Sequence, residues 1–330
     1  MPKSYPLVTS IVLCYKKFDH LYDAINSILN QDYPRIELII SDDASGNFPE
    51  ENVRNYIQKN KKNNIVNTKI IINRQNLGTV RNLNGALKAG SGEYFVGLPG
   101  DDVFYDNTVM RRVVERFVET GNEILCCRRL RCSEEGLLPL RLMPNNAYLP
   151  IIKMINSPKK QYRAFALGRY YEMASGSTTY FSRKHFERWG YFDESYILWE
   201  DGPFFAQYTR SGNIIPTAYD IIAIRYREGG ISNSKPNPLM LKDYSRFINV
   251  ECYQHKDKFN KLDRRYLSFL FERSTKFKGY SKSKQIWILI KYFDVVIHKL
   301  GYKYFGLFIS FYESNIRSFN EVKGEKNGLQ

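Results

Sequence analysis

The chain contains 330 residues, 43% of them hydrophobic and 25% charged, which is an ordinary composition for a globular protein. This length can form one large core, or one core with a smaller appended domain. The composition excludes a repeat protein, because no internal repeat or low-complexity tract is present. It predicts no transmembrane helix, because no run of about 18 uncharged apolar residues occurs.

Positive charge is concentrated toward the C-terminus. The net charge is +15, and residues 256–330 carry sixteen Lys and Arg against seven Asp and Glu. A basic excess favours acidic partners, namely nucleic acid, anionic lipid head groups or phosphorylated substrates.

The five cysteines show neither metal-ligand spacing nor the even number typical of a disulfide framework. Cys126 and Cys127 lie in an apolar run, so we expect buried thiols in a reducing cytosol. A strand-like segment follows the N-terminus at once, without an apolar run of signal-peptide length, which also favours a cytoplasmic protein.

Strands and helices alternate from the start of the chain. Apolar runs at 7–15, 36–41 and 69–73 predict buried strands, and helical spacing at 20–29 and 53–62 predicts the helices between them. Short links between such elements indicate parallel strands joined by right-handed crossovers. The fold class is therefore α/β, with a mainly parallel central sheet flanked by helices.

The stretch 76–102 continues this pattern and ends in two carboxylates. Residues 79–89 predict a helix, and residues 93–98 predict a strand that Pro99 stops. Asp101-Asp102 therefore follow the carboxyl end of a central strand, where ligands bind in open α/β sheets.

A second acidic pair, Asp42-Asp43, follows the strand at 36–41, so both pairs are expected at one crevice. Adjacent carboxylates repel each other unless a cation or donor hydrogens compensate them. For either pair alone, an acidic turn that caps the next helix is the simpler interpretation.

The second half of the chain predicts further elements. Residues 132–161 contain four prolines and are predicted to be irregular. The predicted helices are 109–119, 183–189 and 203–210, and the predicted strands are 123–131, 173–182 and 214–226.

From Asn237 onward the chain is predicted to be helical. Seven apolar residues form one stripe of the last long helix: Ile286, Leu289, Ile290, Phe293, Val296, Ile297 and Leu300. Polar residues lie opposite: Lys291, Asp294, His298 and Lys299. This amphipathic helix is expected to pack on the main domain or a partner subunit; the alternative is an anionic membrane surface.

Four segments, in this order, resemble the inverting glycosyltransferases of family 2: residues 8–15, 27–46, 76–102 and 174–201. A weaker match covers 225–232. Four ordered segments at fitting intervals are far more specific than any one of them.

The resemblance implies the GT-A fold and a division of the chain. Residues 1–236 would form the catalytic domain, with a donor-binding half at 1–131 and an acceptor-side half at 132–236. Residues 237–330 would form a basic, aromatic-rich helical extension.

The resemblance also implies a nucleotide-sugar donor, most often a UDP-sugar. Asp43 matches the carboxylate that receives the imide hydrogen of uracil, and Asp42 beside it is placed in the same donor site. Arg81 falls near the family's basic residue on the base or the diphosphate.

At the second acidic pair the resemblance implies a site for Mn²⁺ or Mg²⁺. Asp102 matches the direct metal ligand, and Asp101 lies nearer to the ribose. The chemistry agrees, because the leaving diphosphate gains negative charge and hard oxygen ligands suit these ions. Pro99-Gly100 stand where the family often has an Asp two places before the ligand, which leaves metal dependence open.

Asp201 matches the general base. Inversion needs one carboxylate on the opposite face of the donor, within about 3 Å of the acceptor hydroxyl, to take its proton. Asp201 comes from a distant part of the sequence, as a base facing the donor across a cleft should. Trp199 is interpreted as a packing residue, with stacking on an acceptor sugar as the alternative.

These residues together predict an inverting glycosyltransferase of hexosyltransferase type. The basic C-terminal region suggests a saccharide acceptor carried on polyprenyl diphosphate at the inner membrane face, as in capsule, O-antigen or exopolysaccharide assembly. We therefore expect a cytoplasmic protein that is peripheral on the cell membrane, and a homo-oligomer stays open.

Three other interpretations remain. Pro99 keeps open a catalytically inactive relative that serves as a partner subunit. A sugar-phosphate nucleotidylyltransferase would need a Gly-rich, Arg-containing loop after the first strand, where residues 14–18 read CYKKF. A nucleic-acid-binding module would fit the charge, but no recognised binding motif is present, so we expect no nucleic acid partner.

Overall fold

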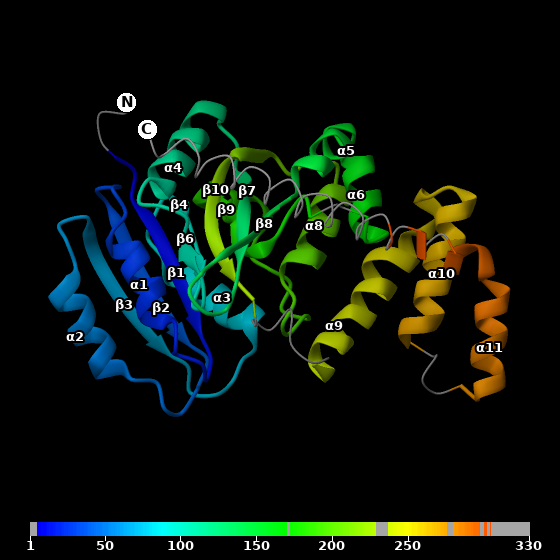
Figure 1. Cartoon of the computed structure of the whole chain (residues 1–330), viewed down its shortest axis with the longest axis horizontal. Helices are drawn as coiled ribbons and strands as arrows, with labels where there is room; N and C mark the ends of the chain where they lie inside the picture. The colour runs from blue at the N-terminus through cyan, green and yellow to red at the C-terminus, as the bar shows by residue number, and fades with distance from the viewer. Residues whose placement is uncertain are drawn as a thin grey trace, which may run out of the picture.

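The computed structural model describes residues 5–169, 172–228, 237–275, 280–297, 300–301 and 304. Figure 1 shows a mixed α/β fold in which helices flank a twisted central sheet. The sheet has the strand order β3-β2-β1-β4-β9-β7-β10-β6, with β5 also paired to β1 and β8 to β7.

The N-terminal half alternates strands and helices as predicted: β1 (Val8–Cys14), α1 (Leu21–Leu29), β2 (Ile36–Asp42), α2 (Glu50–Asn60) and β3 (Ile65–Ile72). β2 pairs in parallel with both β1 and β3, and the register places Asp42 opposite Cys14 on one side and Ile72 on the other. The three strands therefore end at one edge of the sheet, which confirms the predicted parallel order.

The predicted strand at 93–98 is two short strands, β4 (Tyr94–Phe95) and β5 (Leu98–Pro99). Both pair in parallel with β1, so Asp101-Asp102 still follow the carboxyl edge. The neighbouring elements are α3 (Thr79–Ala89), β6 (Val103–Phe104) and α4 (Val109–Thr120).

Between β4 and β7 the sheet changes direction twice. β9 (Thr179–Ser182) is antiparallel to both β4 and β7 (Ile124–Cys132), and β10 (Thr217–Arg227) is parallel to β7. Two antiparallel steps restore the direction of β1. The ends of β7 and β10 therefore lie at the same edge as Asp42 and Pro99.

Residues 132–161 are not irregular, so that prediction is wrong. The segment forms β8 (Pro139–Met143), which is antiparallel to β7, then α5 (Leu149–Met154) and α6 (Pro158–Ala166). Pro158 opens α6, and the Ser157 side chain caps it by accepting a hydrogen bond from the N–H of Lys160. Proline in a first helical turn removes only an N–H that has no intrahelical partner.

Two hydrophobic cores lie on the two faces of the sheet. One joins the strands to α1, α2 and α4. The other joins them to α3, α5, α6, α7 (Arg183–Trp189) and α8 (Asp201–Arg210). All five cysteines are buried free thiols, which confirms the expectation for Cys126 and Cys127.

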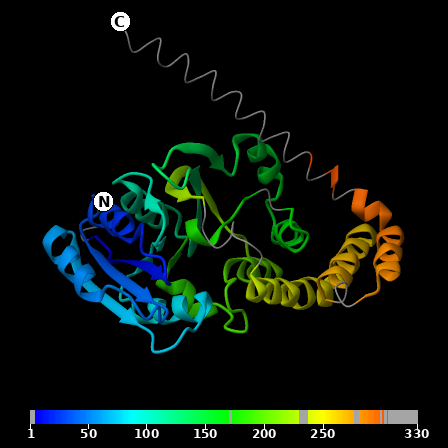
Figure 2. The same cartoon turned by 60° about the horizontal axis from the view of Figure 1, so that its bottom comes forward.

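The C-terminal helices α9 (Pro238–Phe247), α10 (Lys261–Thr275) and α11 (Lys282–Lys291) extend the second core. Two irregular helical turns, Ile248–Cys252 and Tyr253–Lys258, join α9 to α10. Figure 2 shows these helices reaching outward from the sheet, with α11 farthest from it.

The apolar stripe predicted to pack inward lies largely exposed. The side chains of Ile286, Ile290 and Phe293 are 58%, 68% and 64% exposed. The helical segment packs instead through a different set of buried residues: Ile288, Tyr292 and Val295. The stripe therefore does not cover the main domain, and His298 and Lys299 lie outside the described residues.

Candidate active site

The two residues of the first acidic pair bind different segments: Asp42 binds the turn after β2, and Asp43 binds the loop before α3. Asp42 is buried, and its carboxylate accepts hydrogen bonds from the N–H (2.9 Å) and the hydroxyl of Ser45. This closes the turn that follows β2. The structure gives Asp42 this local role, and its place in a donor site stays a prediction.

Asp43 fixes the loop that leads into α3. Its Oδ1 accepts hydrogen bonds from the N–H of Leu77 (2.8 Å) and the side-chain amide of Asn73 (3.1 Å), and its Oδ2 accepts one from the N–H of Gly78 (2.9 Å). A carboxylate offers about four acceptor positions, so about one stays open for a ligand. Asp43 thus lies at the sheet edge and can accept about one further hydrogen bond.

Arg81 lies in the first turn of α3. Its side chain is 56% exposed, and its Nε is 3.6 Å from the carboxylate of Glu194. An exposed ion pair of this length stabilises little. The side chain is therefore free to reorient toward an anionic ligand.

The second acidic pair has one buried and one partly exposed member. Asp102 is fully buried, and its Oδ1 accepts a hydrogen bond from the N–H of Arg227 at the end of β10 (2.8 Å). Its Oδ2 has no hydrogen-bond partner among the described residues. Burial raises the pKa of Asp102 well above its usual value, and the charge of Asp101 raises it further, against the N–H of Arg227 and the guanidinium of Arg129.

These residues fit a divalent cation. The Oδ2 of Asp102 is an unpaired buried oxygen beside a second carboxylate, and hard oxygen ligands are those that Mn²⁺ and Mg²⁺ prefer. Within the described ranges, no group of three or more His, Cys, Asp and Glu side chains is placed so that it could hold a metal ion.

Asp201 is the first residue of α8, and both of its oxygens are held by backbone. The N–H of Gly176 donates to Oδ2 and the N–H of Gly202 donates to Oδ1, each at 2.7 Å. Gly176 allows a close approach here, because a Cβ at this position would lie 2.5 Å from Oε1 of Glu200 and the Glu200 side chain would have to move. Asp201 is partly exposed, so a substrate can reach it.

Arg129 connects the two parts of the site. Its guanidinium donates to the hydroxyls of Ser175 and Ser177, which flank Gly176, and its positive charge also acts on Asp102. The predicted metal ligand and the predicted base thus approach the same arginine, although more than 90 residues separate them.

Glu200 precedes the predicted base and differs from it. Burial raises the pKa of the Glu200 carboxyl, and the neighbouring Asp201 raises it further. A neutral Glu200 avoids two adjacent negative charges at the start of α8. A protonated Glu200 beside an ionised Asp201 suits a pair in which Asp201 accepts a proton.

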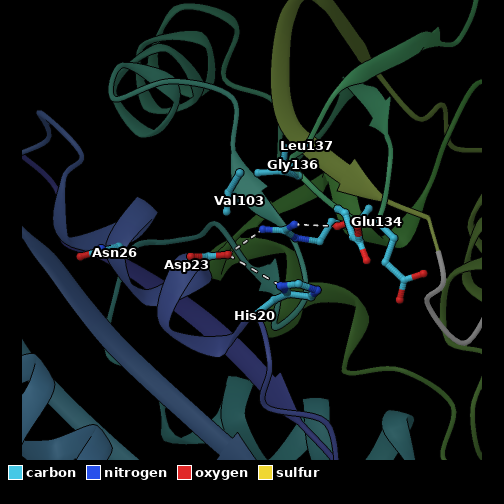
Figure 3. A pocket seen from close by; sticks show the side chains of 9 residues that line it. His20, Asp23, Asn26, Val103, Glu134, Gly136 and Leu137 are labelled. Carbon is cyan, nitrogen blue, oxygen red and sulfur yellow. Dashed lines mark hydrogen bonds and ion pairs between the residues drawn. The ribbon is translucent and has the colours of Figure 1, made fainter.

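A separate cavity of about 600 Å³ lies beside Arg227, between α1 and the β7–β8 hairpin. The guanidinium of Arg227 donates to the carboxylate of Asp23 (2.7 Å) and to the carbonyl oxygen of Glu134 (2.9 Å). Figure 3 labels Asp23 and Glu134 among the residues that line this cavity. Arg227 thus ties α1 and the hairpin to Asp102, which its own N–H holds.

Sequence reasoning missed two residues that shape this site, Arg129 and Asp243, and it placed Arg227 only within the weaker match at 225–232. Arg129 had a signal, because it is a charged residue within the apolar strand β7. Asp243 had none, since its partners lie 44 to 46 residues away in the chain. Trp199 packs against Tyr244 and Phe247 of α9, as the packing interpretation expected.

Comparison with protein-family models matches residues 9–190 to the model described as glycosyl transferase family 2. Among curated proteins, an uncharacterized glycosyltransferase of Haemophilus influenzae is 34% identical over 98 residues, which are 30% of this chain and 29% of that protein. TuaG of Bacillus subtilis, named for a place in teichuronic acid biosynthesis, is 30% identical over 97 residues, 29% of this chain and 36% of TuaG. The chain thus matches about a third of the length of these relatives.

Two solved structures share the fold. TarS of S. aureus (residues 1–349) has a TM-score of 0.56 and 14% identity, over 84% of this chain and 93% of TarS, and a further TarS structure contains UDP-GlcNAc. The mannosyltransferase PcManGT of Pyrobaculum calidifontis, in complex with GDP-Man and Mn²⁺, has a TM-score of 0.55 and 16% identity, over 92% of this chain and 84% of that chain. Among the described residues, no helix combines the length and apolar character that a membrane span needs.

Proposed function

Because the chain belongs to glycosyl transferase family 2 and has the GT-A fold, we propose that it transfers a sugar from a nucleoside diphosphate donor to an acceptor hydroxyl with inversion. The observation that carries the proposal is the gathering of Asp43, Asp102 and Asp201 at the carboxyl edge of the sheet. Arg129 stands between the last two.

Asp201 is proposed to act as the general base. The acceptor oxygen forms a bond to the anomeric carbon as the bond from that carbon to the diphosphate oxygen breaks, and the acceptor proton passes to Asp201. The N–H groups of Gly176 and Gly202 fix both oxygens of this carboxylate, so its direction is set before the acceptor arrives.

Asp43 and Asp102 are proposed to hold the donor. A carboxylate like Asp43 accepts the imide N–H of uracil, which favours a UDP-sugar, while Arg81 reaches the diphosphate and Asp101 the ribose. Asp102 would bind Mn²⁺ or Mg²⁺, which when bound offsets the negative charge of the diphosphate. Donors are seen in the related folds: UDP-GlcNAc in TarS and GDP-Man with Mn²⁺ in PcManGT.

Nucleotide release from a panel of UDP-, GDP- and dTDP-sugars tests this function. We expect the purified protein to consume one donor class in the presence of Mn²⁺ or Mg²⁺, because the site offers one base-recognising carboxylate and one cation position. Equal release from all donors would contradict recognition of the base by Asp43.

The acceptor is proposed to be a saccharide on a lipid carrier. The exposed apolar stripe, which begins on α11 and continues past it through Phe293, would bring the protein to this acceptor by lying on an anionic membrane surface. Large exposed apolar patches mark interaction surfaces, and exposed Lys282 and Lys284 at the start of α11 complement acidic head groups. We therefore expect a protein that works at the cytoplasmic face of the membrane.

Sedimentation with phosphatidylglycerol vesicles at about 150 mM salt checks this surface. The wild type should bind. The double variant Ile290→Ser/Phe293→Ser should bind about tenfold more weakly, because it buries less apolar surface in the membrane. The matched control is the double variant Leu138→Ser/Met154→Ser, which should bind like the wild type. These two side chains are 64% and 66% exposed but lie outside the stripe. A wild type that stays in solution contradicts the proposal.

A further inference from the structure

A buried carboxylate of the C-terminal helices organises the segment that leads to Asp201. Asp243 lies on α9 and is 1% exposed. Its Oδ2 accepts hydrogen bonds from three consecutive backbone N–H groups, those of Ile197 (2.9 Å), Leu198 (2.7 Å) and Trp199 (3.2 Å). Its Oδ1 also accepts one from Ile197 (3.1 Å). These bonds fix the backbone directly before Glu200-Asp201.

The same segment is held from the opposite side by α3. The carbonyl oxygen of Ile197 accepts a hydrogen bond from the N–H of Val80 (3.1 Å). A Cβ at Gly78 would lie 2.7 Å from that oxygen, so glycine allows this close approach. The N–H of Gly78 in turn donates to Asp43. Residues 197–199 therefore lie clamped between the loop that Asp43 holds and the helix that carries Asp243.

α9 also packs against the side chain of Trp199, two residues before the predicted base. The ring of Trp199 lies 4.8 Å from that of Phe247 and 6.1 Å from that of Tyr244, measured between centroids. Gly202 leaves space for the indole, because a Cβ there would lie 2.2 Å from it. Backbone and side chain before Asp201 are thus both fixed by α9.

We propose that Asp243 is a positioning residue: by binding the N–H groups of residues 197–199 it sets the place of Asp201 relative to the donor. This rests on the proposed function of Asp201 as the base. It makes α9, which lies beyond the matched residues 9–190, part of the catalytic site. A shift of about 1 Å in a catalytic group can cost a hundredfold in rate.

Steady-state kinetics of Asp243→Ala and Asp243→Asn test the proposal. Asp243→Ala should lower kcat for transfer about 10- to 100-fold, with KM for the donor changed less than about twofold, because the donor-holding residues are not moved. The kcat of Asp243→Asn should lie between those of the wild type and Asp243→Ala, since the amide oxygen of Asn can still accept hydrogen bonds from these N–H groups.

Asp263→Asn is the matched control, because it removes another buried carboxylate of the C-terminal helices, which binds Arg163 instead. It should lower the melting temperature without lowering kcat. Folded Asp243→Ala that retains wild-type kcat would overturn the proposal.

Fluorescence of Trp199 gives a readout that does not depend on activity. In a background with Trp189→Phe and Trp287→Phe, Asp243→Ala should increase acrylamide quenching of Trp199 at temperatures where the protein stays folded. Unchanged quenching would overturn the positioning role. If quenching increases but the protein uses no nucleotide sugar, Asp243 still fixes residues 197–199, and the proposed function is rejected.

Discussion

Asp201→Asn is expected to slow sugar transfer by about 10²- to 10⁴-fold, the usual contribution of a general base. The amide keeps the size of the side chain and can still accept one hydrogen bond, from Gly176 or Gly202, so the start of α8 should survive. It cannot take the acceptor proton. Donor affinity should change less than about threefold, because Asp43 and Asp102 are untouched.

The measurement is the rate of product formation at saturating donor, with calorimetry for donor affinity. Asp257→Asn is the control, since Asp257 is 84% exposed and its contact with Arg264 is long, at 4.0 Å. Transfer by Asp201→Asn within about threefold of the wild type would show that another group takes the proton.

Glu37→Gln is expected to lower the free energy of unfolding by about 3 kcal/mol at pH 7, because it breaks a buried charged network. Glu37 is fully buried in β2 and joins β1, β3 and the segment before β4. Its carboxylate binds four side chains, of Thr9, Asn67, Lys69 and Ser91, and also the N–H of Ser91.

The effect should depend on pH. Burial opposes ionisation of Glu37, but the hydrogen bonds from Lys69, Ser91 and Thr9 outweigh it and lower its pKa to about 2, from an ordinary value of 4.5. A lowered carboxyl pKa stabilises the fold above the unfolded value and loses that stabilisation as the pH falls from about 4.5 to about 2. The difference between wild type and Glu37→Gln should therefore shrink over that range.

Urea unfolding at pH 7 and at pH 3 checks both statements. Glu50→Gln serves as the control, because Glu50 pairs with Arg54 at the surface and should contribute less than about 1 kcal/mol. Equal losses for the two variants, or a Glu37→Gln loss that does not change with pH, would contradict this account of the network.

The parallel half of the fold and the position of its acidic pairs were predictable. The runs at β1, β2 and β3 are apolar throughout, and helical spacing between them admits few topologies. Carboxylates directly after such strands must lie at the carboxyl edge. The predicted strand at 93–98 is split near Val96, but the predicted position of Asp101-Asp102 is unaffected, because both halves pair with β1.

The errors have local physical causes. Prolines at 150 and 158 begin helices rather than interrupt them, so their number misled the prediction for 132–161. In the last helical segment nearly every turn carries apolar residues on two faces, and amphipathicity alone does not say which face packs. Contacts such as Asp243 with Trp199 join distant segments, and no local pattern encodes them.

The most direct test of the central claim is nucleotide release from UDP-, GDP- and dTDP-sugars by the purified full chain, with Mn²⁺ or with EDTA. We expect release from one donor class, its loss in EDTA, and its loss in Asp102→Ala. The contradicting result is a folded protein that releases nucleotide from none of these donors and, in calorimetry with Mn²⁺, binds none of UDP, GDP and dTDP. That outcome would favour an inactive relative that serves as a partner subunit.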